Sequence, residues 1–210
     1  SLSGGAPTGK GGEKTEESSG PGGPAGEAEG MTESDWIIEP ATAASLADIL
    51  RIEEACFSAP WTRKMLEGEL SGNPFAHFLM ARERGGAETS AGSIVGYLCY
   101  WIVFEEVRLM NLAVIESMRH QGIARSLVSA ALQAGLSQCA TRAVLEVRVS
   151  NAAAQTLYQS FGFCRVAVRP KYYSNPVEDA VLMELDPIVL GSGAGFVVRP
   201  KEGGHSKPLQ

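Results

Sequence analysis

The sequence predicts an α/β (α+β) fold in which a single mixed β-sheet carries helices on both faces. Strand patterns with hairpin character come first, and a strand–helix–strand–helix–strand order follows in the second half of the chain. This succession is typical of one mixed sheet, because the later strands need helical connections that pack on its faces. With 210 residues, the chain is long enough for one domain with additional segments at its ends.

The first half of the chain has clear strand and helix patterns. The expected elements are a strand at 36–40, helices at 43–57 and 63–70, and strands at 75–82 and 92–103. Pro60 and Trp61 interrupt the helical spacing of apolar residues, and Thr62 can cap the second helix. The polar loop 84–88 is typical of a hairpin between the two later strands.

The second half has longer and more regular patterns. The expected elements are a strand at 107–114, a helix at 123–138, a strand at 143–149, a helix at 152–161, and strands at 163–169 and 178–185. A turn separates the first of these strands from the long helix that follows it. This junction is the most informative part of the sequence.

Both ends of the chain differ from the middle in composition. Residues 1–30 are mostly Gly, Pro, Ser, Glu and Lys, so they cannot bury enough apolar surface to offset the entropy of ordering. We therefore expect a disordered extension at 1–30, a folded domain at 31–187 and a poorly ordered tail at 188–210.

The charge and cysteine pattern limit the possible functions. A net charge of -6 and a pI near 5.2 argue against a dedicated nucleic-acid binder, which needs a basic face to displace counterions from phosphates. The longest strongly apolar run, 93–104, is too short to span a bilayer, and the cysteines form no CxxC pair. We expect a cytoplasmic protein with reduced thiols and a protein partner, without nucleic-acid or membrane binding.

The segment 112–125 has the features of an anion site. It runs from a strand through a glycine-containing turn into a helix, where outward N–H groups and the helix dipole favour negative charge. Gly122 and Ala124 would let a pyrophosphate approach the backbone, and Arg119 and Arg125 add positive charge. Taken alone, the pattern is equally compatible with an ordinary turn.

Arg119-x-x-Gly122-x-Ala124 resembles the coenzyme A pyrophosphate motif of the GNAT superfamily of N-acetyltransferases. Further motifs follow in the order of that family, at 145–154, 157–158, 161–163, 169–173 and 178–180. With Phe57-x-x-Pro60-Trp61, they resemble the protein N-terminal acetyltransferases, most of all the RimI-type ribosomal-protein-alanine N-acetyltransferases. The likeness covers about residues 36–186, and Ala124 stands where many members have Gly.

The resemblance implies a GNAT fold with a mostly antiparallel sheet. It also implies direct transfer of acetyl from acetyl-CoA to a protein N-terminus, most specifically to the N-terminal alanine of a small-subunit ribosomal protein. Glu146 is implied as the proton acceptor, and Tyr158 as the general acid that hydrogen-bonds to the leaving thiolate. From the residues alone, a solvent-facing strand position remains open for Glu146, and a ring packed under the sheet remains open for Tyr158.

The implied coenzyme contacts lie on the strand, the turn and a later helix. They are Leu112, Ala113, Val114, Arg119, His120, Gln121, Gly122, Ile123, Ala124, Arg125 and Asn151. Ala113 and Val114 matter through their backbones, because a strand that splays from its neighbour leaves N–H groups that can polarise a thioester carbonyl. Asn151 is equally an ordinary N-cap.

Four aromatic residues are expected to contact the acceptor peptide. Phe57 and Trp61 would shape one wall of its cleft, and Tyr172 and Tyr173 are placed in a loop between the last two strands. Packing within the protein is the alternative role for all four.

Three other functions remain open: a broader protein N-terminal acetyltransferase, an acetyl-CoA sensor without turnover, and a small-molecule amine acetyltransferase. Glu146 and Tyr158 count against the sensor. An acetyl-cysteine intermediate at Cys139 or Cys164 would need an activated thiolate, which no sequence feature supports. His77 and His120 are isolated from other ligand types, so no metal is expected.

Overall fold

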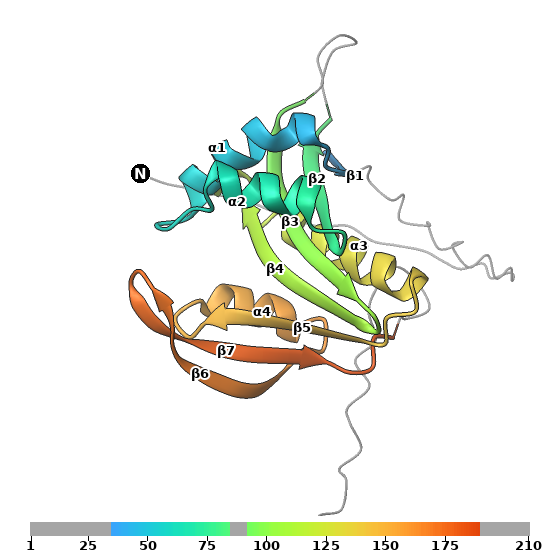
Figure 1. Ribbon diagram of the computed structural model, residues 1–210, viewed down its shortest axis with the longest axis vertical. Helices are drawn as coiled ribbons and strands as arrows, with labels where there is room; N and C mark the ends of the chain where they lie inside the picture. The colour runs from blue at the N-terminus through green and yellow to red at the C-terminus, as the bar shows by residue number, and fades with distance from the viewer. Residues whose placement is uncertain (1–34, 85–91, 190–210) are drawn as a thin grey trace, which may run out of the picture. The chain divides into compact units, whose positions relative to one another are not determined.

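Seven strands form one mixed sheet in the computed structural model, which describes residues 35–84 and 92–189 (Figure 1). The strands are β1 (Trp36–Pro40), β2 (Ala76–Glu83), β3 (Ile94–Val103), β4 (Glu106–Val114), β5 (Arg142–Arg148), β6 (Cys164–Ser174) and β7 (Val177–Leu185). Their order across the sheet is β1-β2-β3-β4-β5-β7-β6. The pair β4/β5 is parallel and the other described pairs are antiparallel, which confirms the predicted mixed sheet.

Helices cover both faces of this sheet, as the sequence predicts. The α-helices are α1 (Leu46–Cys56), α2 (Arg63–Glu67), α3 (Ile123–Ser137) and α4 (Ala152–Gln159), and the short helical turns are η1 (Ala43–Ser45), η2 (Gly68–Gly72) and η3 (Glu116–Met118). Figure 1 shows α1 and α2 on one face and α3 and α4 on the other.

Two apolar clusters fill the space between the sheet and its helices. The larger cluster joins the sheet to α3 and α4 and includes Leu127, Val128, Leu132, Leu145, Val147, Tyr158 and Phe161. The smaller cluster lies under α1 and α2 and includes Ile49, Ile52, Leu66, Met80, Tyr97 and Ala113. Because side chains alternate along a strand, membership of these clusters tells which face of the sheet each neighbouring residue occupies.

The end of β6 is the one predicted boundary that misses by more than three residues. The sequence pattern ends this strand at 169, whereas β6 continues to Ser174 across a register shift between Arg169 and Tyr173. Within the shift, Lys171 has a φ of 53°, and its N–H donates to Asp179 Oδ1 at 2.8 Å. Tyr172 and Tyr173 therefore lie in β6 itself, and their predicted placement in a loop is wrong.

The predicted terminal segments lie almost entirely outside the described residues. These segments are 1–30 and 188–210, and most of the loop 84–88 is outside as well. Ile188 and Val189 belong to the predicted tail and are described. Ile188 is buried, and its N–H donates to the C=O of Thr141 at 2.7 Å. None of the helices in 35–84 and 92–189 has the length and apolar character needed to cross a bilayer.

Candidate functional site

The two central strands of the sheet separate after a short parallel contact. β4 pairs with β5 only over Glu106 to Leu109, and both strands then continue, to Val114 and to Arg148. Figure 1 shows them diverging from the end they share. Beyond Leu109, one side of β4 therefore has no neighbouring strand, and backbone groups on that side need another partner.

A β-bulge in β4 coincides with the start of this separation. The register between β3 and β4 shifts by one residue between Leu109 and Asn111, which leaves Met110 without a partner in β3. A bulge bends its strand and increases its twist. The bulge thus accounts for the change in direction that carries β4 away from β5.

The backbone of β4 beyond the bulge presents N–H groups to the open side. The N–H of Ile115 donates to the C=O of Val95 at 2.9 Å, toward β3. Successive residues of an antiparallel strand direct their backbone groups to opposite sides. The N–H groups of Leu112 and Val114 therefore point away from β3, whereas Ala113, for which the sequence predicts an unpaired N–H, directs its backbone groups to β3.

The turn after β4 leads into α3 as the sequence predicts. Gly122 has a φ of 90° and directly precedes the helix, and His120 has a φ of 62°. Ile123 is buried in the larger cluster, while Gln121 and Gly122 are exposed. The first amides of a 15-residue helix thus lie next to exposed backbone, which is the arrangement that binds anions.

Both arginines of the predicted anion site have partners within the protein. Arg119 Nε donates to the C=O of Val114 at 3.1 Å, which ties the turn to β4. Arg125 donates to Ser160 Oγ at 2.7 Å, and its guanidinium lies 5.0 Å from the centre of the Phe161 ring. Arg125 thereby joins α3 to the end of α4. Both side chains are exposed, and each adds its positive charge near the start of α3.

Glu146 lies on β5 and faces the side of α1 and α2. Its neighbours Leu145 and Val147 belong to the larger cluster on the opposite face. The side chain of Glu146 is 19% exposed, and its Oε1 lies 3.1 Å from Arg169 Nη1. The predicted proton acceptor is therefore a carboxylate that is partly accessible to solvent and paired with one half-exposed guanidinium.

Tyr158 lies on α4 and is buried against the larger cluster. Its ring packs edge-on against Phe163, with ring centres 5.8 Å apart. Burial and the nearby Tyr173 raise the pKa of Tyr158, so its hydroxyl stays protonated at pH values above the ordinary tyrosine pKa. Tyr173 itself donates to the C=O of Glu146 at 3.4 Å, and burial raises the pKa of Tyr173 to about 12.

Arg148 fixes the turn between β6 and β7 to the end of β5. Its guanidinium lies 3.1 Å from Glu178 Oε2, donates to the C=O groups of Asn175 and Pro176, and stacks 4.0 Å from the centre of the Tyr173 ring. The sequence places Arg148 and Glu178 in family motifs without giving them a role. Their pairing follows only when the strands are brought together.

The remaining predicted site residues have mixed placements. Asn151 caps α4, since its Oδ1 accepts from the N–H of Ala154 at 3.1 Å. Phe57 and Trp61 pack against the smaller cluster and remain partly exposed. Tyr172 is 49% exposed and packs edge-on against the Tyr173 ring.

A polar cluster under α1 was missed by the sequence-based prediction. It consists of Glu53, Tyr97 and Asn111, which come from α1, β3 and β4 and are joined by hydrogen bonds. Glu53 has no exposed surface, although it is charged in its ordinary state. Its position four residues after Ile49, on the apolar face of the helix, is the signal that could have revealed it.

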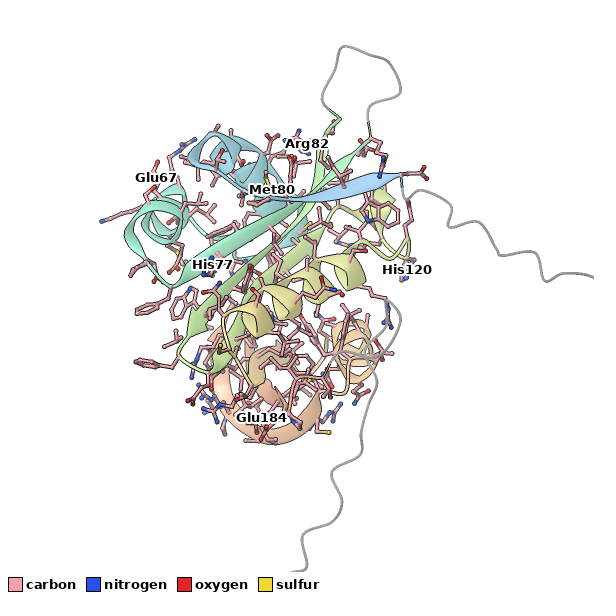
Figure 2. The ribbon with its side chains drawn as sticks, turned by 90° about the vertical axis from the view of Figure 1, so that its right-hand side faces the viewer. Glu67, His77, Met80, Arg82, His120 and Glu184 are labelled. Atoms are coloured by element: carbon pink, nitrogen blue, oxygen red, sulfur yellow. The ribbon has the colours of Figure 1, made fainter. Side chains whose placement is uncertain are left out.

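The histidines and cysteines show no common site in the part of the chain that the structure describes. No group of three or more His, Cys, Asp or Glu in 35–84 and 92–189 is arranged to hold a metal ion. His77 stacks on Tyr100, and Figure 2 shows His77 and His120 far apart. Cys139 and Cys164 are exposed free thiols.

The sequence and the fold are similar to those of known acetyltransferases. A model of the acetyltransferase (GNAT) family matches residues 46–163, more than half of the chain. The chain is 32% identical to the [ribosomal protein bS18]-alanine N-acetyltransferase of Haemophilus ducreyi, over 65% of this chain and 90% of that protein. It is 30% identical to the Escherichia coli K12 protein of the same name, over 64% of this chain and 86% of that protein.

Solved structures agree with this relationship. The crystal structure of the ribosomal-protein-S18-alanine N-acetyltransferase from Escherichia coli matches with a TM-score of 0.64 and 26% identity, covering 77% of this chain and 99% of that chain. Arabidopsis thaliana NAA60 in complex with acetyl-CoA shares the fold, with a TM-score of 0.65 and 17% identity over 72% of this chain and 98% of that chain.

Proposed function

Because the chain belongs to the GNAT acetyltransferase family, we propose that it transfers acetyl from acetyl-CoA to the N-terminal α-amino group of a protein. The observation that carries the proposal is the separation of β4 from β5. The candidate base Glu146 lies on one of these strands, and the candidate acid Tyr158 lies on the helix that follows it.

The proposed acceptor is the N-terminal alanine of a small-subunit ribosomal protein. Two bacterial relatives named for this reaction on bS18 are similar to the chain over most of their own length. A broader specificity for protein N-termini is the second candidate, because tyrosine hydroxyls such as those of Tyr172 and Tyr173 can hydrogen-bond to an acceptor backbone whatever side chains the acceptor carries.

The open side of β4 fits the extended arm of acetyl-CoA. The N–H groups that Leu112 and Val114 direct away from β3 can donate to the amide-containing pantetheine chain and polarise the thioester carbonyl. The coenzyme pyrophosphate would then bind at the exposed turn 120–122, where the start of α3 supplies further N–H groups.

Glu146 is the proposed proton acceptor. An N-terminal α-amino group has a pKa of about 7.7–8.0 in solution, so a modest base is enough to free its lone pair near neutral pH. The Glu146 carboxylate takes this proton, directly or through a water molecule, as the amine nitrogen attacks the thioester carbon. Its ion pair with Arg169 holds the carboxylate in one orientation before the acceptor arrives.

Tyr158 is the proposed donor to the leaving sulfur. When the carbon–sulfur bond breaks, the thiolate of coenzyme A accepts the Tyr158 proton, and solvent later restores it. The raised pKa of Tyr158 keeps the hydroxyl protonated until that step. Direct transfer in a ternary complex requires no acetylated residue of the protein.

The acceptor peptide is proposed to enter between the α1–α2 loop and the β6–β7 hairpin. Both lie on the side toward which β4 and β5 diverge in Figure 1. Tyr172 and Tyr173 border this entrance from β6, and Phe57 and Trp61 border it from the loop. These four side chains are the candidates for contact with the first residues of the acceptor.

A panel of short peptides tests the proposal. The peptides differ in their first residue, and an internal-lysine peptide and free polyamines serve as comparison acceptors for acetyl-CoA. Preferential modification of an Ala-starting ribosomal peptide is expected. Equal rates for many N-termini would favour a broader protein N-terminal acetyltransferase. Faster reaction of polyamines would favour a small-amine acetyltransferase, and coenzyme binding without any transfer would favour a sensor.

A further inference from the structure

The buried carboxylate of Glu53 joins three separate parts of the protein. Its Oε2 accepts from the backbone N–H of Trp61 at 2.6 Å. Its Oε1 accepts from the Tyr97 hydroxyl and from Asn111 Nδ2, the latter at 2.7 Å. Asn111 Nδ2 also lies 2.9 Å from the Tyr97 hydroxyl. The α1–α2 loop, β3 and β4 are therefore connected through one side chain.

The energetics of this cluster make it hard to rearrange. Glu53 and Tyr97 are fully buried, and the three donors to the carboxylate are neutral groups. Burial raises the pKa of Glu53, while the hydrogen bonds from Tyr97, Trp61 and Asn111 oppose that rise. Removing any donor leaves a buried carboxylate oxygen with fewer partners, and such a group is costly. The cluster therefore favours one geometry.

The cluster connects the two structures that must meet around an acceptor. Trp61 is in the α1–α2 loop, which borders the proposed peptide entrance. Asn111 directly follows the bulge residue Met110 and precedes Leu112, the first residue that directs its N–H to the open side of β4. A weaker contact parallels this link, since Cys56 Sγ lies 3.6 Å from the C=O of Val114.

We propose that Glu53 is a positioning residue that sets the distance between the α1–α2 loop and the separated part of β4, and thereby the affinity for the acceptor peptide. The inference rests on the proposed function, because it assumes that an acceptor binds beside this loop. Glu53 touches neither the acceptor nor the coenzyme in this scheme. It acts through Trp61 and Asn111.

The test uses Glu53→Gln in the full chain, with Glu54→Gln as a matched control. Glu54 is the next residue of α1 and is exposed, so the control makes the same chemical change away from the cluster. Glutamine keeps the size of the side chain but sets an NH2 group against one of the three donors. For Glu53→Gln, we expect the KM for an Ala-starting peptide to rise about tenfold, which is the effect of a loop that keeps its binding geometry about one tenth of the time.

Two further readouts separate positioning from simple stabilisation. Backbone amide exchange in 57–62, followed by mass spectrometry, should become at least several-fold faster in Glu53→Gln. The Kd for acetyl-CoA should stay within about twofold, because pairing with β3 still holds the coenzyme-binding part of β4 in place. A lower melting temperature with unchanged KM and unchanged exchange in 57–62 would show that the cluster only stabilises the fold, and would overturn the proposal.

Two additional variants keep the test decisive. If Glu53→Gln does not fold, Tyr97→Phe removes a single donor and should raise the KM and the exchange rate in the same direction. In the double variant Glu53→Gln with Asn111→Asp, an amide and a carboxylate again face each other with their positions exchanged. This variant should partly restore the wild-type KM and the wild-type amide exchange rate of 57–62. If the wild type acetylates no peptide N-terminus, the proposed function fails, and the exchange rates of 57–62 alone decide whether Glu53 holds the loop.

Discussion

Two glutamates on the same side of the sheet have opposite surroundings. Glu53 is fully buried and accepts hydrogen bonds from three neutral donors, whereas Glu146 is 19% exposed and pairs with one half-exposed arginine. A buried carboxylate that accepts three hydrogen bonds holds its neighbours in place. A carboxylate with accessible lone pairs can accept a proton. The same residue type is thus suited to holding the structure together at position 53 and to accepting a proton at position 146.

The largest expected effect is on turnover in Glu146→Gln. The amide cannot accept the proton of the attacking amine, so we expect kcat to fall about 10²–10⁴-fold, the usual contribution of a general base. Steady-state acetylation of the Ala-starting peptide measures this. The Kd for acetyl-CoA should be nearly unchanged, and a wild-type kcat in this variant would remove Glu146 from the mechanism.

The next effect is expected for Tyr158→Phe. The variant keeps the buried ring but loses the donor to the leaving thiolate, so we expect kcat to fall about 10²-fold. Because burial raises the pKa of Tyr158, the wild-type hydroxyl stays protonated between pH 7 and about 10. The ratio of wild-type to variant rates should therefore be constant over that range. A ratio that declines toward pH 10 would mean that Tyr158 loses its proton earlier.

Gly122→Val should weaken the binding of acetyl-CoA without changing the surroundings of Glu53 or Glu146. With a φ of 90°, Gly122 has a backbone conformation that costs about 1–2 kcal/mol for other residues, so the turn must change shape. We expect the Kd for acetyl-CoA to rise about tenfold, measured by calorimetry. A wild-type Kd would show that the pyrophosphate binds elsewhere.

The smallest expected effect is on the free energy of unfolding, which should respond differently to losing the contacts of Glu146 and of Glu53. Arg169→Gln removes the ion pair of Glu146, and since the Arg169 side chain is half exposed, the free energy of unfolding should change by less than about 1 kcal/mol. Glu53→Gln should lower it by about 1.5–3 kcal/mol, because a buried charged group loses a hydrogen bond. Urea unfolding of both variants measures the difference, and equal losses would contradict the contrast drawn here.

The sequence predicts the arrangement of strands and helices well because that arrangement follows from local periodicity. It fails at the end of β6, where Lys171 has a positive φ and the register shift interrupts the alternation of side chains. A two-residue period carries no information once extra residues enter the strand. The sequence pattern therefore places Tyr172 and Tyr173 in a loop, although both continue the strand.

The candidate site was predictable only where it coincides with a continuous motif. The turn before α3 can be read from Gly122 and its neighbours, because a phosphate site at a helix N-terminus is local. The partners of Glu53 lie 8, 44 and 58 residues away in the sequence. Their convergence depends on how α1 packs on β3 and β4, which no local pattern specifies. The same is true of the ion pair between Glu146 and Arg169.

The bulge in β4 has a consequence for how this protein tolerates genetic change. Met110 is the residue in excess of the β3 register, and its side chain is exposed. Replacing Met110 by another residue would keep the excess and the bend, whereas deleting the codon would remove both and reduce the separation of β4 from β5. At this position the bend of β4 depends on the number of residues more than on their identity. Natural variants should therefore carry different residues at position 110 but keep the length of β4.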